Sequence, residues 1–236
     1  MKEKGKGKKA KRFGILVVGC ACMASAFALR ATADMQTMPP GITRTQVLDN
    51  ATVMIARLNM APGARETVHT HPFSAVVVQL TVGEVEMRVG TRRETAQRGH
   101  EHVEFIAAEM PHAAANVGTN PFALITIALK PDRVRGGTQA PAEAPPGISR
   151  KQVLDNTDAR ATWVVFEPGA REPVHSHPFD LVLVQLNPGR MEVLVGENKT
   201  VKDYAMGDVL FLPRNVPHAV SNVDTKRFDV MSVAVK

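Results

Sequence analysis

The chain has 236 residues, a formal net charge of +6 and an aromatic content of 5%. The excess positive charge lies at the front, because residues 1–33 hold eight of the 29 Lys and Arg residues but only one of the 23 Asp and Glu residues. The rest of the chain is close to neutral, with no basic stripe and few aromatic residues for stacking on bases, so nucleic acid is excluded as an expected partner.

Residues 1–33 have the three-part layout of a secretory signal peptide. A basic start is followed by an uncharged stretch at residues 13–29 and by Ala31-Thr32-Ala33. We expect cleavage after Ala33 and an exported mature protein, periplasmic or secreted, that no longer contacts the membrane. Two alternatives stay open: an uncleaved membrane anchor, for which the stretch is short, and lipoprotein anchoring at Cys20.

Both cysteines, Cys20 and Cys22, lie in this leader. The expected mature chain therefore has neither disulfides nor thiolate chemistry, and its stability must come from packing.

After the leader, the chain carries one module twice. Residues 39–130 align without a gap on residues 145–236, and 39 of the 92 paired positions are identical. A repeat this long indicates two tandem domains rather than a solenoid. We expect a first domain at residues 34–130, a Pro-, Gly- and Ala-rich linker at 131–144 and a second domain at 145–236.

Each module is predicted to consist of β-strands. Its apolar runs are short and rich in β-branched residues, and Gly, Pro, Asn and Asp interrupt them every 8 to 12 residues. Only residues 44–50 suggest a helical period. The clearest predicted strands are residues 75–80, 84–89, 123–129, 181–186, 191–195 and 228–235. This pattern is typical of an all-β sandwich or barrel.

Histidines are the main candidates for chemistry. His69 and His71, and 106 residues later His175 and His177, are two residues apart, so on a strand each pair points to one face. A third histidine, His112 or His218, follows 41 residues after each pair. Three neutral imidazoles suit a divalent transition metal and leave open positions for water or substrate.

These patterns resemble the cupin family. In the first motif of that family, five residues separate a glycine from His-x-His and a second glycine follows. Both modules match, with Gly63 and Gly83 in the first and Gly169 and Gly189 in the second. The second motif contains Gly, Pro, Gly, His and Asn at fixed spacing. The second module keeps it, with Asn215 at the second glycine, whereas the first keeps only His112 and Asn116. The resemblance implies two tandem jelly-roll β-barrels, a bicupin, with a metal inside each barrel.

One departure from the family concerns the fourth ligand. The glutamate that the family places after His-x-His is replaced by Val76 and Val182, which we expect to face the site. Gln79 and Gln185 should then point away from it. Other carboxylates considered as substitutes are Asp180 in the second module and the repeated pair Glu86 and Glu192.

The resemblance implies a metal-dependent, dioxygenase-like oxidoreductase that acts on a small organic molecule. Iron is the first choice of metal, and zinc, manganese, nickel and copper stay open. The competing hypotheses are a cell-envelope cupin that binds a ligand or has a structural role without turnover, and a barrel whose histidines have lost their metal. We expect the first module to bind metal less well, and a homo-oligomer stays open.

Two further groups of residues have a simpler interpretation. His100 and His102 have no counterpart in the second module and are expected in solvent. Arg65-Glu66 and Arg171-Glu172 are interpreted as ion pairs at the barrel rim, worth little energetically, with substrate orientation as the alternative.

Overall fold

The computed structural model describes residues 38–137, 139 and 143–236. The predicted signal peptide at residues 1–33, with the alternative lipid site at Cys20, lies outside the described residues. Residues Thr37–Lys236 form one compact unit.

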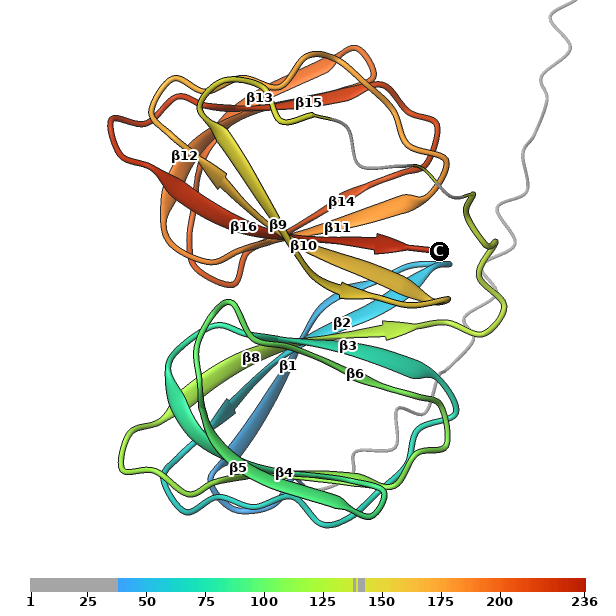
Figure 1. The fold of residues 1–236 in the computed structure, drawn as a ribbon, viewed down its shortest axis with the longest axis vertical. Helices are drawn as coiled ribbons and strands as arrows, with labels where there is room; N and C mark the ends of the chain where they lie inside the picture. Colours follow the sequence, from blue (N-terminus) through green and yellow to red (C-terminus); the bar gives the residue numbers. More distant parts are fainter. Residues whose placement is uncertain (1–37, 138, 140–142) are drawn as a thin grey trace, which may run out of the picture. The chain divides into compact units, whose positions relative to one another are not determined.

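The described residues form sixteen strands and no helix (Figure 1). The first eight are β1 (Ile42–Asp49), β2 (Val53–Met60), β3 (Ser74–Gln79), β4 (Gly83–Val89), β5 (Arg92–Arg98), β6 (Val103–Ile106), β7 (His112–Asn116) and β8 (Phe122–Leu129). The other eight are β9 (Ile148–Asp155), β10 (Ala159–Phe166), β11 (Asp180–Gln185), β12 (Gly189–Val195), β13 (Asn198–Tyr204), β14 (Val209–Leu212), β15 (His218–Asn222) and β16 (Phe228–Val235).

All six predicted strands are confirmed to within two residues. The helical period suggested for residues 44–50 is wrong, because these residues belong to strand β1 and its end. Strand formation there is decided by antiparallel pairing with β2 and not by the local pattern.

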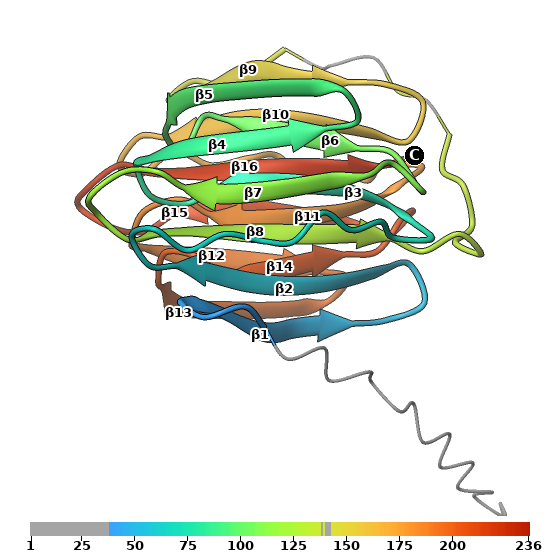
Figure 2. The same ribbon diagram turned by 90° about the horizontal axis from the view of Figure 1, so that it is seen from below.

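Each half of the chain closes two antiparallel sheets into a barrel, as the all-β jelly-roll prediction requires. The second half has a five-stranded sheet in the order β14-β11-β16-β10-β9 and a three-stranded sheet in the order β13-β12-β15. The first half repeats this arrangement with β1-β2-β8-β3-β6 and β5-β4-β7. Figure 2, which looks onto the sheets from below, shows the strands running side by side, with those of one barrel overlapping those of the other.

The central strands of each five-stranded sheet are buried on both faces, which explains the continuous apolar runs of β3, β8, β11 and β16. In β16, Phe228 and Val230 pack inside the second barrel, whereas Met231 and Val233 belong to a second cluster. This second cluster also contains Val53, Ile55 and Ile125 from the first half of the chain. We call it the shared apolar layer, because the five-stranded sheets of both barrels contribute to it.

Polar contacts flank the shared apolar layer. Thr52 Oγ1 donates a hydrogen bond to Asp180 Oδ2 at 2.9 Å, and Arg57 Nη1 donates to the carbonyl oxygen of Met206 at 3.1 Å. Burial of these groups with satisfied hydrogen bonds fixes which parts of the two sheets meet.

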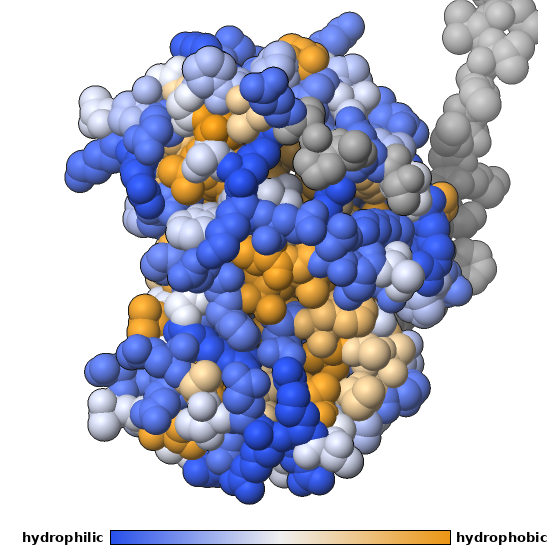
Figure 3. All heavy atoms as spheres, in the orientation of Figure 1, coloured by the Kyte–Doolittle hydropathy of each residue, from blue (hydrophilic) through white to orange (hydrophobic). Residues whose placement is uncertain are grey.

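The surface of the barrels is predominantly hydrophilic on the face that Figure 3 shows, with apolar residues exposed in its middle. No helix of the described residues is long and apolar enough to cross a membrane.

Candidate metal centres

The second barrel brings its three predicted histidines together at the end of the sheets. His175 and His177 lie in an extended segment that leads into β11, and His218 is the first residue of β15. His175 and His218 face each other in an isolated antiparallel bridge and exchange both backbone hydrogen bonds, at 3.0 and 2.8 Å. This bridge closes the long sequence separation between the first and third histidine.

Ligand atoms of His175, His177 and His218 all lie within 4.8 Å of one another. The Nε2 atoms of His175 and His177 are 3.1 Å apart, and Nε2 of His218 is buried without a hydrogen-bond partner. A zinc-like ion 2.0–2.1 Å from each nitrogen would separate the ligand atoms by roughly 3.4 Å. Small side-chain adjustments therefore suffice for the three imidazoles to share one ion.

The other ring nitrogen of each imidazole determines which tautomer is present. Nδ1 of His175 lies 2.8 Å from the Pro173 carbonyl oxygen, and Nδ1 of His218 lies 2.9 Å from that of Val216. A carbonyl oxygen only accepts, so Nδ1 carries the proton and Nε2 keeps its lone pair. Two lone pairs 3.1 Å apart repel each other unless a cation lies between them. The triad therefore fits a metal ion by its chemistry as well as by its spacing.

His177 obtains the same orientation from the segment between the barrels. Its Nδ1 lies 2.8 Å from the side-chain oxygen Oε1 of Gln139, while the main-chain oxygen of Gln139 accepts a 2.9 Å hydrogen bond from Arg160. No sequence pattern signalled this role, because Gln139 lies in the predicted linker.

Burial favours the neutral form of two histidines in each triad, His71 and His112 in the first and His177 and His218 in the second. Burial, followed by the charges of the neighbouring histidines, lowers the pKa of His71 and of His177 to about 4. Burial also lowers the pKa of His112 and of His218, although their backbone hydrogen bonds act in the opposite direction. Neutral imidazole is the form that binds a metal.

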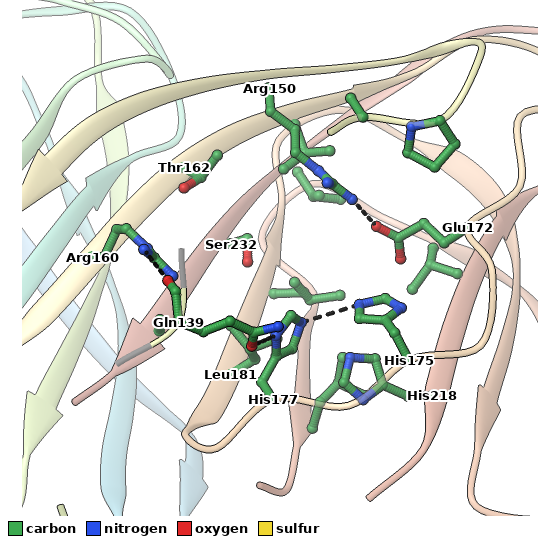
Figure 4. Close-up of a pocket in the computed structure, with 18 of the residues that line it drawn as sticks. Gln139, Arg150, Arg160, Thr162, Glu172, His175, His177, Leu181, His218 and Ser232 are labelled. Atoms are coloured by element: carbon green, nitrogen blue, oxygen red, sulfur yellow. Dashed lines mark hydrogen bonds and ion pairs between the residues drawn. The ribbon is translucent and has the colours of Figure 1, made fainter. Parts of the chain in front are cut away.

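A cavity of about 500 Å³ opens beside the second triad. In Figure 4 the histidines lie together at one side of it, with Arg150 and Glu172 above them and Arg160, Thr162 and Ser232 on another wall. Phe179 and Leu181 add apolar surface to the lining. A cavity of this size and mixed lining fits a small organic ligand.

The first barrel repeats the triad with less support around it. His69, His71 and His112 converge within the same 4.8 Å, and His69 and His112 direct Nδ1 to the carbonyl oxygens of Thr67 and Met110 at 2.8 Å each. The position 106 residues before Gln139 is Ala33, which lies outside the described residues.

Comparison with known proteins identifies the second half of the chain. Residues 162–234 match the family model described as Cupin domain. The matched segment is a cupin domain. The internal repeat extends the likeness to the first half, and no curated protein sequence matches the chain significantly.

Solved structures with a similar fold cover both barrels of this chain. AerE from Microcystis aeruginosa superposes with a TM-score of 0.68 at 16% identity, over 85% of this chain and 95% of the other. The oxalate decarboxylase of Lactobacillus farciminis has a TM-score of 0.68 at 12% identity, over 83% and 82%. The salicylate 1,2-dioxygenase of Pseudaminobacter salicylatoxidans has a TM-score of 0.66 at 12% identity, over 86% and 78%. Identities this low establish the two-barrel cupin fold alone.

The prediction that Val76 and Val182 face the site is wrong. Both valines are fully buried in the shared apolar layer, on the opposite face of β3 and β11. Strand alternation instead directs Leu181 and Leu183 into the cavity of the second cupin barrel. The position at which the family has its glutamate therefore faces away from the histidines in this chain. Sequence spacing alone did not reveal this orientation.

None of the carboxylates considered as fourth ligands belongs to a described histidine group. Asp180 accepts hydrogen bonds from Thr52 and Arg214, and these outweigh the effect of burial and lower its pKa. Glu86 pairs with Arg93 at 2.7 Å, and Glu192 pairs with Lys199 at 2.9 Å.

Gln79 and Gln185 share the alternation of the inward-facing residues, contrary to the prediction that they point away. Each donates a hydrogen bond from its side-chain nitrogen to a carbonyl oxygen two residues further on, and Gln185 is not part of the lining of the second cavity.

Other sequence candidates have mixed outcomes. His100 is exposed and His102 lies 3.5 Å from Glu104, and neither joins a described metal group. The expected pairing of Arg171 with Glu172 is wrong: Glu172 lies in the cavity wall and pairs with Arg150 at 2.8 Å, whereas Arg171 pairs with Glu192.

Proposed function

We propose that this bicupin is an exported, metal-dependent oxidoreductase of the dioxygenase kind, which oxidises a small organic molecule at the second histidine triad. One observation carries the proposal: three imidazoles direct their Nε2 lone pairs to one point beside a cavity. Known two-barrel structures lend support, since the salicylate 1,2-dioxygenase of Pseudoaminobacter salicylatoxidans forms adducts with gentisate and the oxalate decarboxylase of Bacillus subtilis has Mn(II) centres.

Iron is the proposed metal. Three imidazoles without a carboxylate leave the dipositive charge of the ion uncompensated and several coordination positions open. Bound there, iron would supply redox chemistry with dioxygen. His175, His177 and His218 would hold the ion, while Leu181, Phe179 and the cavity walls would limit access of bulk water.

The proposal that the protein is exported rests on residues 1–33 alone. Their basic start, apolar stretch and small residues before Asp34 are typical of a cleaved secretory signal. To test this part of the proposal, the full chain is expressed in a bacterium, the periplasmic proteins are released by opening the outer membrane, and the N-terminus of the released protein is sequenced. A mature N-terminus at Asp34 is expected.

Metal analysis of untagged protein tests the centres. We expect about two metal ions per chain after loading with iron or zinc, about one in His71→Ala and in His177→Ala, and two in the control His100→Ala, which alters an exposed histidine outside both triads. Protein that takes up no metal after loading contradicts the proposal.

Oxygen consumption separates an enzyme from a binding protein. The iron-loaded protein is offered diketones, catechols, hydroxybenzoates and thiols, and uptake should be lost in His177→Ala but largely kept in His71→Ala. Metal binding without oxygen uptake from any compound would favour the alternative, a cupin that binds a small molecule without turnover.

A further inference from the structure

The two barrels retain the same histidines but differ in the wall next to them. Strands β2 and β10, which have equivalent places in the two sheets, share no identical residue at any aligned position. Where β10 directs Arg160 and Thr162 into the cavity, β2 has Met54 and Ala56. The metal-ligand residues are thus common to both barrels, whereas the ligand-contacting wall is specific to the second.

Arg160 lies close to the second triad. Its guanidinium carbon is 5.6 Å from the centre of the Phe179 ring, which in turn stacks on His177 at 5.1 Å with an interplanar angle of 10°. Phe179 therefore contacts both the guanidinium and the His177 imidazole.

The charge of Arg160 has no counter-ion among the described residues. The other arginine of the cavity, Arg150, pairs with Glu172 at 2.8 Å, but no ion pair of the described residues includes Arg160. One of its five N–H donors goes to the Gln139 carbonyl oxygen. Glu143, the remaining acidic residue of the lining, is exposed.

Hydroxyl groups continue this polar wall. Thr162 and Ser232 are direct partners in the β10–β16 pairing, and both side chains line the cavity (Figure 4). The wall thus offers a guanidinium and two hydroxyls, next to a centre that has a dipositive charge when a metal is bound. A ligand that complements this charge has to be an anion.

We propose that the second cavity binds a small organic acid, whose carboxylate is held by Arg160 and whose other end carries an oxygen atom that reaches the histidine centre. This inference deepens the proposed function, on which it rests, by naming the substrate class. The planar fork of arginine matches the two oxygens of a carboxylate. The first barrel lacks this recognition because Met54 is apolar.

Binding to zinc-loaded protein tests the inference without turnover. Two pairs of probes are compared by calorimetry: gentisate with its neutral analogue hydroquinone, and oxalate with its diamide oxamide. At least one acid should bind roughly tenfold or more tightly than its neutral analogue. Acids that do not bind, or that bind no better than their analogues, overturn the inference.

Arg160→Met, which installs the residue of the first barrel, should weaken acid binding roughly tenfold or more. The comparison is made at saturating zinc, because Arg160 also holds the main chain of Gln139 and so supports His177. Binding of the neutral analogues to the zinc-saturated variant should stay unchanged. The control Arg171→Met removes the same charge from an exposed arginine outside the cavity lining and should bind acids as the wild type does. If Arg160→Met fails to fold, Arg160→Lys serves instead and should give a smaller loss, because it keeps the charge without the fork.

Unchanged acid binding in the Arg160 variants, or an equal loss in Arg171→Met, contradicts the inference. These outcomes differ from a failure of the proposed function. Protein that takes up no zinc after loading lacks the metal centres on which both proposals rest. Acid binding without oxygen uptake by the iron-loaded protein contradicts the proposed oxidation but not the binding of an organic acid.

Discussion

Gln139 lies outside both repeats of the sequence, yet its side chain orients a candidate ligand of the second centre. The 2.8 Å contact between Oε1 and Nδ1 of His177 fixes the ring, as outer-shell partners of metal-binding histidines commonly do. The contact also connects the segment between the barrels with the centre, because the main chain of Gln139 is held by Arg160.

Gln139→Ala should lower the metal affinity of the second centre by about 10- to 100-fold and leave that of the first unchanged. Competition with a chelator, followed by metal analysis in the His71→Ala background, isolates the second centre. Equal affinity with and without the Gln139 side chain would show that the contact does not support metal binding.

Glu109 and Asn215 occupy the position that is usually the second glycine of the family's second motif. Both have positive φ, 58° and 57°, and their amides donate to the carbonyl oxygens of His71 and His177 at 2.7 Å. The backbone conformation that favours glycine is thus retained without glycine. Asparagine tolerates it far better than glutamate does.

Glu109→Gly should raise the free energy of unfolding by about 1 kcal/mol, because it relieves this strain. Asn215→Gly should change it by no more than about 0.5 kcal/mol. Urea unfolding of metal-free protein compares the two variants, and a larger gain for Asn215→Gly would contradict the explanation.

At the scale of the elements, the glycines that begin β4 and β12 permit close packing. A Cβ atom added to Gly189 would lie 2.7 Å from Cβ of Phe228, and one added to Gly83 would lie 2.6 Å from Cδ1 of Phe122. Both phenylalanines are almost fully buried. The repeat preserves the glycine and the phenylalanine together because each fits only beside the other.

Gly189→Ala should destabilise the protein by about 1–3 kcal/mol through overpacking. The control Gly99→Ala, whose added Cβ would have its nearest contact at 3.8 Å and whose φ is not positive, should stay within about 0.5 kcal/mol. Thermal and urea unfolding measure the difference, and equal effects at the two positions would refute the packing argument.

The whole molecule is organised around the shared apolar layer. Val182 belongs to it, whereas its neighbour Leu181 lines the cavity of the second barrel. A carboxylate placed at the two positions therefore meets opposite environments: a dry apolar cluster in one case and the wall of an open cavity in the other.

Val182→Glu should destabilise the protein by several kcal/mol, and by at least about 2 kcal/mol more than Leu181→Glu. Solubility and urea unfolding of metal-loaded protein rank the two variants. If Val182→Glu were the better tolerated of the two, the family glutamate position would face the site after all.

The sequence determined the repeat, the strands and the histidines, because these depend on local periodicity and fixed spacing. Runs of apolar residues located β3, β8, β11 and β16 to within one residue, and His-x-His with a later histidine predicted both triads. Val76 and Val182 could not be assigned from spacing, because both faces of their strands are apolar and alternation then gives no direction. Only the tertiary structure decided that they belong to the shared layer, that Glu172 pairs with Arg150 in the cavity wall, and that Gln139 reaches His177. These contacts join residues distant in sequence, and their physical basis is the closure of the barrels, which no local pattern encodes.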